Sequence, residues 1–155
     1  MISKAAREYR PALDFFAKPR QVETPEMDRQ PQLQAAPVPS AFLLESDEGF
    51  ARTILTLCQS VSLAARHYAA PDGFWRDVSP QSRGCVVSNI WLPGTTGLQV
   101  QEAMLARRIC LPIIFISAHP DVRTAVESLK RGAFDFLEKP PSHEVLLEAI
   151  LRAVK

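Results

Sequence analysis

The sequence predicts an α/β fold in which a doubly wound, five-stranded parallel sheet carries five helices on its two faces. Short apolar runs such as PIIFIS, residues 112–117, have no polar alternation and are typical of strands buried on both faces. These runs alternate with segments of helical periodicity. The connections are short, which favours right-handed crossovers between parallel strands. We therefore expect the strand order 2-1-3-4-5.

The regular pattern begins at residue 41. AFLL (41–44) predicts the first strand, and an apolar stripe at helical spacing between Phe50 and Leu57 predicts the first helix. Val61, Leu63 and Ala65 alternate with polar residues, which indicates the second strand. APDGFW supplies a turn and a short helix, and CVVS the third strand.

Pro93 and Gly94 break the chain after the third strand, and residues 97–108 are expected to form a helix. The fourth strand is PIIFIS. Asp121 is the expected N-cap of the next helix, which Gly132 ends. The expected inner stripe of that helix is Val122, Ala125, Val126 and Leu129.

AFDFL (133–137) predicts the fifth strand, and Ser142 is the expected cap of the last helix. The inner side of that helix is predicted from its apolar residues, which are Val145, Leu146, Ala149, Ile150 and Ala153.

Residues 1–40 differ in composition from the rest of the chain, because they hold six of the 13 prolines and no glycine. We expect a tail with a proline-rich linker at about 18–40, followed by one folded domain at 41–155. The segment YRPALDFFA near the amino terminus leaves two interpretations open, a short docking helix or a disordered end.

Charge and hydropathy exclude several classes of function. The net charge of +1 gives no electrostatic basis for direct binding to nucleic acid. No apolar run approaches the roughly 20 residues that span a membrane, and no signal peptide is evident, so we expect a cytoplasmic protein. Cys58, Cys85 and Cys110 are widely spaced, which predicts reduced thiols rather than disulfides or a metal site.

In the expected fold, the carboxyl ends of the strands meet at one edge of the sheet, where ligand chemistry is usually located. Strands one, three, four and five end there in Glu45, Asn89, Ser117 and Lys139.

Three strings at these strand ends, LPGTTGLQVQEAM (92–104), LPIIFISAHPDV (111–122) and RGAFDFLEKP (131–140), resemble a response-regulator receiver domain of the FixJ type. The resemblance covers about 41–155 and implies the flavodoxin-like or CheY-like version of the fold. It also implies a two-component pathway, in which a histidine kinase donates a phosphoryl group to an aspartate after strand three. An acidic pair after strand one then holds Mg²⁺.

Matched by position, the resemblance assigns the phosphate-contacting hydroxyl and lysine to Ser117 and Lys139, and the switch aromatic to Phe136. Two other positions depart from the pattern. The phospho-acceptor position falls on Asn89, and the acidic pair falls on Glu45 and Ser46.

These departures predict a pseudo-receiver rather than an enzyme. An amide cannot form the acyl phosphate that a carboxylate forms. The loss of carboxylates degrades the Mg²⁺ site, so we expect no metal and no other cofactor. Trp91 adds a large side chain at the rim, Ser46 becomes an expected helix cap, and Glu45 is left able to pair with Lys139.

The expected partners are a histidine kinase or another signalling protein, with neither direct nucleic-acid nor membrane contact. A homodimer is expected through the fourth helix, fifth strand and fifth helix. That region carries charges of both signs, at Lys130, Arg131, Asp135 and Glu138.

Other readings stay open. The chain ends at Lys155, after the last helix, so we expect no output domain unless it is the receiver fragment of a DNA-binding transcriptional regulator. A phosphorylatable single-domain response regulator is a further alternative. A flavin-binding enzyme of this fold is disfavoured, because no Ser/Thr-rich phosphate loop follows strand one.

Overall fold

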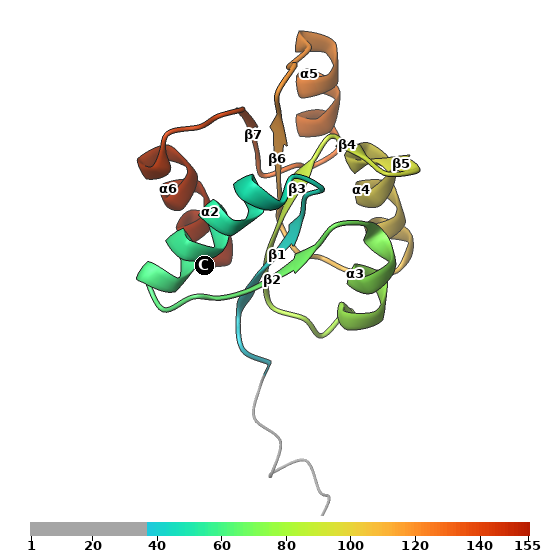
Figure 1. Ribbon diagram of the computed structural model, residues 1–155. Coiled ribbons are helices and arrows are strands. Elements are labelled where there is room, and N and C mark those ends of the chain that lie inside the picture. Colours follow the sequence, from blue (N-terminus) through green and yellow to red (C-terminus); the bar gives the residue numbers. More distant parts are fainter. Residues whose placement is uncertain (1–36) are drawn as a thin grey trace, which may run out of the picture. The chain divides into compact units, whose positions relative to one another are not determined.

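The computed structural model describes residues 37–155, so the segment YRPALDFFA and most of the expected linker lie outside the described residues. Within this range a five-stranded parallel sheet has the order β2-β1-β3-β6-β7, which confirms the predicted order (Figure 1). The strands are β1 (Ser40–Leu44), β2 (Ala64–Tyr68), β3 (Gly84–Asn89), β6 (Ile113–Ser117) and β7 (Asp135–Glu138). The helices are α2 (Glu48–Ser60), α3 (Pro71–Asp77), α4 (Gly97–Ala106), α5 (Val122–Lys130) and α6 (His143–Val154).

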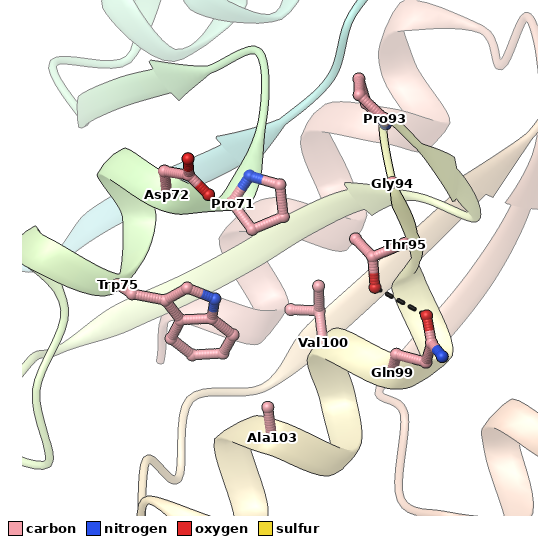
Figure 2. Close-up of a pocket in the computed structure, with 9 residues that line it drawn as sticks. All are labelled: Pro71, Asp72, Trp75, Pro93, Gly94, Thr95, Gln99, Val100 and Ala103. Atoms are coloured by element: carbon pink, nitrogen blue, oxygen red, sulfur yellow. Dashed lines mark hydrogen bonds between the residues drawn. The ribbon is translucent and has the colours of Figure 1, made fainter.

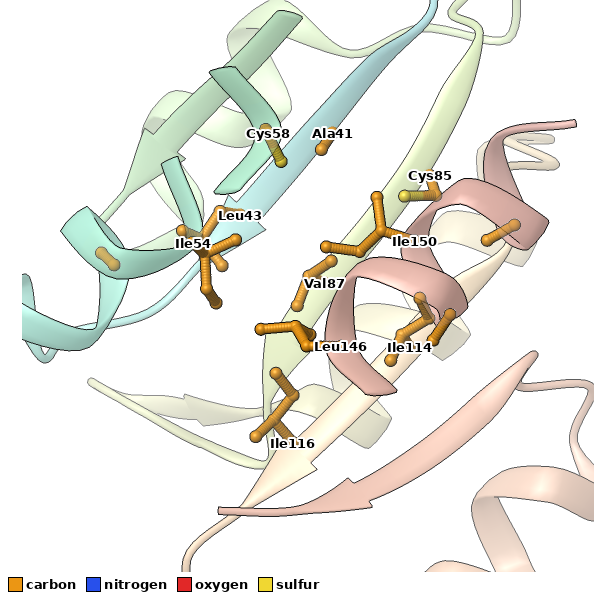
Figure 3. Close-up of a cluster of buried hydrophobic side chains, with 13 residues drawn as sticks. Ala41, Leu43, Ile54, Cys58, Cys85, Val87, Ile114, Ile116, Leu146 and Ile150 are labelled. Atoms are coloured by element: carbon orange, nitrogen blue, oxygen red, sulfur yellow. The ribbon is translucent and has the colours of Figure 1, made fainter. Parts of the chain in front are cut away.

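Each face of the sheet has its own apolar core. Figure 3 shows the first, where Ile54 of α2 and Ile150 of α6 pack against β1, β3 and β6. The second core joins the opposite face to Phe74 of α3 and Met104 of α4. Both faces are therefore covered, as the continuous apolar strands require.

Strand alternation sends neighbouring residues to the two cores. Leu43 is paired with Val87 and belongs to the core beneath α2 and α6. Phe42 is paired with Val86 and belongs to the core beneath α3 and α4. Because the strands are parallel, this register brings their carboxyl ends to one edge of the sheet.

The prediction for the second strand was displaced by about three residues. Val61 is the C-cap of α2, and its amide donates to Cys58 and Gln59. Ser62 turns the chain with a φ of 59°. The alternation from Val61 to Ala65 therefore falls mostly on a helix end and a turn, and the strand starts only at Ala64.

A small hairpin was not predicted. β4 (Trp91–Leu92) and β5 (Thr95–Thr96) pair antiparallel around Pro93 and Gly94. The turn uses the positive φ of 73° at Gly94, which glycine adopts without steric cost. Thr96 then caps α4 in a capping box with Gln99.

The expected inner stripe of α5 was wrong. Val122 is 81% exposed, and Val126 and Leu129 are 44% and 47% exposed. Ser128 is instead the buried residue of this helix, and its hydroxyl donates to the carbonyl oxygen of Ala125 at 2.8 Å. This local bond satisfies the hydroxyl, so a polar residue faces inward while the apolar stripe faces outward.

Two predicted caps are confirmed. The side chain of Asp121 accepts from the amide of Arg123 at the start of α5, and that of Ser142 accepts from Val145 at the start of α6. Val145 itself is half exposed rather than on the inner side of α6. None of the helices within 37–155 is long and apolar enough to cross a membrane.

Candidate functional site

The side chain of Glu45 is the centre of a polar cluster at the carboxyl edge of the sheet. It follows β1 directly and is 1% exposed. Its Oε1 lies 2.8 Å from Nζ of Lys139, and its Oε2 accepts from Nδ2 of Asn89 at 3.3 Å. Oε2 also accepts from the amide of Asp47 at 3.0 Å. Both oxygens of this carboxylate are thus occupied by donors from the chain itself.

Lys139 follows β7 and reaches across the sheet edge to Glu45. Its side chain is 14% exposed, and Nζ lies 4.6 Å from the centroid of the Phe50 ring on α2. A cation above an aromatic face is attracted by the ring quadrupole. The ammonium group is therefore positioned by two contacts, an ion pair with Glu45 and a cation–π contact with Phe50.

Ser117, the last residue of β6, has a buried hydroxyl at the same carboxyl edge of the sheet. Its Oγ accepts from the amide of His119 at 3.3 Å, and its carbonyl oxygen accepts from the amide of Lys139 at 2.8 Å. The backbone bond joins β6 to β7 at the site, while the hydroxyl is engaged by the loop that follows β6.

Phe136 lies three residues before Lys139 on β7 and is half buried. It packs against the core beneath α3 and α4 rather than into the polar cluster. Trp91 is 65% exposed on β4, the strand that follows Asn89 almost directly.

Ser46 is exposed, and the expectation that it caps the first helix was wrong. Asp47 is the N-cap of α2, and its Oδ1 accepts from the amide of Phe50 at 3.1 Å. Both residues are good caps by type, and the helix begins one residue later than the sequence interpretation assumed. The carboxylate of Asp47 is therefore committed to α2.

His67 and Phe50 were not recognised from the sequence as neighbours of the site. Nε2 of His67 lies 2.7 Å from the carbonyl oxygen of Glu45 and forms a hydrogen bond with it. His67 is near the end of β2, which pairs with β1. The predicted strand order therefore could have placed His67 beside Glu45. Phe50 was assigned only to the apolar stripe of α2, and periodicity does not show that a ring also faces a cation.

A separate cavity of about 500 Å³ lies among α3, α4 and the β4–β5 hairpin (Figure 2). Trp75 and Val100 line it, and Thr95 donates to Oε1 of Gln99 at its rim. None of the strand-end residues Glu45, Asn89, Ser117 and Lys139 is part of its lining. The polar cluster and this cavity are therefore distinct features.

The described part of the chain contains no group of three or more His, Cys, Asp or Glu side chains arranged to hold a metal ion. At the sheet edge the donors are one carboxylate, one amide and one hydroxyl, together with the ammonium group of Lys139. Lys139, the amide of Asn89 and the backbone amide of Asp47 together surround the single negative charge of Glu45.

Comparison with protein families matches residues 42–151 to the response regulator receiver domain, and the chain belongs to that family. Receiver domains are signalling domains of two-component systems, and their partners are histidine kinases. The resemblance to FixJ-type receivers and the five-stranded fold are both confirmed.

Among curated proteins, the transcriptional regulatory protein TdiR of Thauera aromatica is 39% identical over 117 residues, which cover 74% of this chain and 51% of that protein. The response regulator protein TodT of Pseudomonas putida F1 is 34% identical over 114 residues, covering 74% and 50%. The transcriptional regulatory protein FixJ of Azorhizobium caulinodans is 32% identical, covering 70% and 51%. This chain spans about half the length of these relatives.

Solved structures of response regulators also match this chain. The response regulator StyR matches with a TM-score of 0.71 and 30% identity, covering 76% of this chain and 59% of that one. The structure named FixJ-N matches with a TM-score of 0.67 and 28% identity, covering 75% and 93%.

Proposed function

We propose that this protein is an atypical response-regulator receiver that acts through protein–protein contacts without phosphorylation of an aspartate. The observation that carries the proposal is the amide of Asn89 at the carboxyl end of β3, hydrogen-bonded to Glu45. In the family, this strand end is the phospho-acceptor position. Acyl phosphate formation needs an anionic carboxylate as nucleophile, and an amide is not one.

The donor set at this edge does not fit Mg²⁺. This ion prefers several hard, preferably anionic, oxygens in octahedral geometry. Glu45 is the carboxylate that faces the cluster, and Lys139 and Asn89 already occupy its two oxygens. Asp47 caps α2, and Ser46 supplies only an exposed hydroxyl. A divalent cation would have to displace the ammonium group of Lys139 from Glu45, and it would then be neutralised by a single carboxylate.

The phosphorylation claim is tested by incubating the protein with acetyl phosphate and measuring its intact mass with and without Mg²⁺. We expect no mass gain in either condition. Labelling that depends on Mg²⁺ would support the alternative, a phosphorylatable single-domain response regulator, and would overturn the proposal.

Magnesium binding is tested separately by fluorescence. Trp91 is exposed close to Asn89 along the chain, and Trp75→Phe leaves it as the sole tryptophan. We expect no saturable change in its emission up to millimolar Mg²⁺. A saturable change would show that the edge of the sheet does take the ion.

We also propose self-association through α5, β7 and α6. Val122, Val126 and Leu129 form an exposed apolar stripe on α5, and a symmetric dimer would bury two copies of it. Arg131 is already paired within the chain, with Glu127 at 2.8 Å and Glu102 at 3.5 Å. The other charges proposed for this face are Lys130, Asp135 and Glu138.

Sedimentation of Val126→Asp tests this face. Leu105→Asp is the matched control, because Leu105 is an exposed apolar residue of α4. We expect weaker association in Val126→Asp and in the charge reversal Asp135→Lys, and no change in Leu105→Asp. Equal behaviour of all three variants would assign association to another face.

A second candidate function is the receiver portion of a DNA-binding regulator. It is favoured by the relatives named as transcriptional regulators, of which this chain spans about half the length. In that case the receiver would act on an attached output domain, and the described domain would still make no direct contact with nucleic acid. Sequencing the full-length transcript distinguishes the two.

A further inference from the structure

Gln101 places an amide at a core position of α4. It is 5% exposed, and Val100 and Met104 of the same helix are also buried. Its Nε2 donates to the carbonyl oxygens of Ser128 and Arg131, each at 3.4 Å. Ser128 lies in the last turn of α5 and Arg131 is its C-cap, and the carbonyl oxygen of Ser128 also accepts from the amide of Ala133 at 3.0 Å.

The other end of this amide is not satisfied. Oε1 of Gln101 is the one buried side-chain oxygen or nitrogen within residues 37–155 that has no hydrogen-bond partner. An orphaned buried acceptor lowers stability, and an apolar side chain of similar size would avoid that cost. Packing alone therefore does not account for glutamine here, whereas its two bonds to α5 do.

Most side chains of α5 are exposed or half-buried. Ser128 is its buried residue, and Val122 at its amino end is largely exposed. A second, solvent-exposed link at the carboxyl end is the ion pair of Arg131 Nη1 with Glu102 Oε2 of α4, at 3.5 Å. The helix is thus tied to α4 at one end and presents its apolar stripe along its length.

We infer that Gln101 is a positioning residue that fixes the carboxyl end of α5 and thereby sets the orientation of the apolar stripe. Gln101 does not lie in the stripe itself. The inference rests on the proposed function, because it concerns the surface through which we propose that the protein associates. It names an interior contact between α4 and α5 as a determinant of that association.

The test is hydrogen exchange on the full chain carrying Gln101→Leu. The amides of Arg131, Gly132 and Ala133 bond to carbonyls of the last turns of α5. We expect them to exchange about fivefold faster, as for the loss of one ordinary hydrogen bond. Exchange in α6 should not change. The thermal midpoint should stay the same or rise, since the orphaned oxygen is gone.

A second variant and a control make the result specific. Gln101→Met retains a long side chain without polar atoms, and it should reproduce the faster exchange if Gln101→Leu folds poorly. Gln59→Leu exchanges an exposed glutamine on α2 for the same apolar residue and should leave α5 unchanged. Unchanged exchange at the end of α5 in both Gln101 variants would overturn the inference.

Sedimentation of the same variants separates this inference from the proposed function. We expect the dissociation constant for self-association to rise about threefold in Gln101→Leu, because a loosened helix must be ordered on binding. Faster exchange with unchanged association would overturn the claim that Gln101 orients the stripe. A monomeric parent would overturn the proposed association, while faster exchange in the variant would still support the role of Gln101 in fixing α5.

Discussion

The ammonium group of Lys139 lies 2.8 Å from Oε1 of Glu45, and the two side chains form a nearly buried ion pair at the carboxyl edge of the sheet. Removing one partner of a buried ion pair leaves the other charge buried without compensation. We therefore expect Lys139→Met to lower the free energy of unfolding by about 3 kcal/mol in urea denaturation.

Two further variants test whether burial of the ion pair causes the loss of stability. The double variant Glu45→Leu, Lys139→Met should recover most of the lost stability, because no charge remains buried. Arg152→Met breaks a pair with Glu148 that is exposed and 4.0 Å long, so its effect should be less than about 0.5 kcal/mol. Equal losses in Lys139→Met and Arg152→Met would contradict the argument.

Restoring one carboxylate should not restore phosphorylation. Asn89→Asp replaces a donor to Glu45 by a second acceptor, so it removes a hydrogen bond and adds a like charge. We expect little labelling by acetyl phosphate in this variant. Adding Ser46→Asp should give much more labelling than the two single changes combined, because both new carboxylates serve one site. Intact mass with and without Mg²⁺ measures this, and Asn89→Asp labelled as strongly as the double variant would refute it.

Gly97 should not tolerate a side chain. A Cβ at this position would lie 2.7 Å from Cε1 of Phe115 and 2.8 Å from the carbonyl oxygen of Asn89. Phe115 is fully buried and cannot move aside. We expect Gly97→Ala to cost about 2 kcal/mol. Gly49→Ala is the control: its nearest contact would be an ordinary 3.4 Å, so helix propensity should stabilise α2 by roughly 0.5 kcal/mol. Thermal unfolding of both variants checks the contrast.

Alkaline pH should destabilise the fold through Cys85. Burial raises the pKa of this thiol from 9.0 to about 12, with the nearby Cys58 adding to the shift. Below pH 9 the thiol is protonated in both the folded and the unfolded states. Between pH 9 and 12 only the unfolded state loses the proton, so stability falls by up to about 1.4 kcal/mol per pH unit.

The measurement is urea unfolding at pH 8 and pH 11. Cys85→Ala should reduce the loss of stability between these two conditions, even though the smaller side chain lowers stability at both. Cys110→Ser, at an exposed cysteine, should leave the loss unchanged. An identical pH dependence in Cys85→Ala and the parent would exclude this thiol as a cause.

Much of this architecture follows from local patterns in the sequence. Apolar runs such as 112–117 identify buried strands, and their alternation with helices favours right-handed connections and a doubly wound strand order. The same topology explains why Glu45 and Lys139 lie at one edge of the sheet, although 93 residues lie between them in the chain. Strand ends in a parallel sheet share an edge, and the long side chain of Lys139 spans the two strands, β3 and β6, that lie between β7 and β1.

Other features depend on tertiary context. The periodicity of α5 reveals an apolar stripe, but it does not say whether another element covers that stripe, and Val122 and Val126 are exposed. Strands of two residues, such as β4 and β5, are too short to show a period. The buried role of Gln101 could not be predicted from the sequence, because its partners are backbone carbonyls 27 and 30 positions away.

The outward stripe of α5 is also short, because nine residues of helix rise only about 13 Å. If this stripe makes most of the contact, the area buried falls below the roughly 800 Å² per partner of a standard stable interface, so we expect weak pairing. Weak pairing obeys mass action, and the paired fraction rises with protein concentration. If no phosphoryl group sets the balance, cellular abundance becomes the input, and the level of gene expression takes the place of a kinase signal.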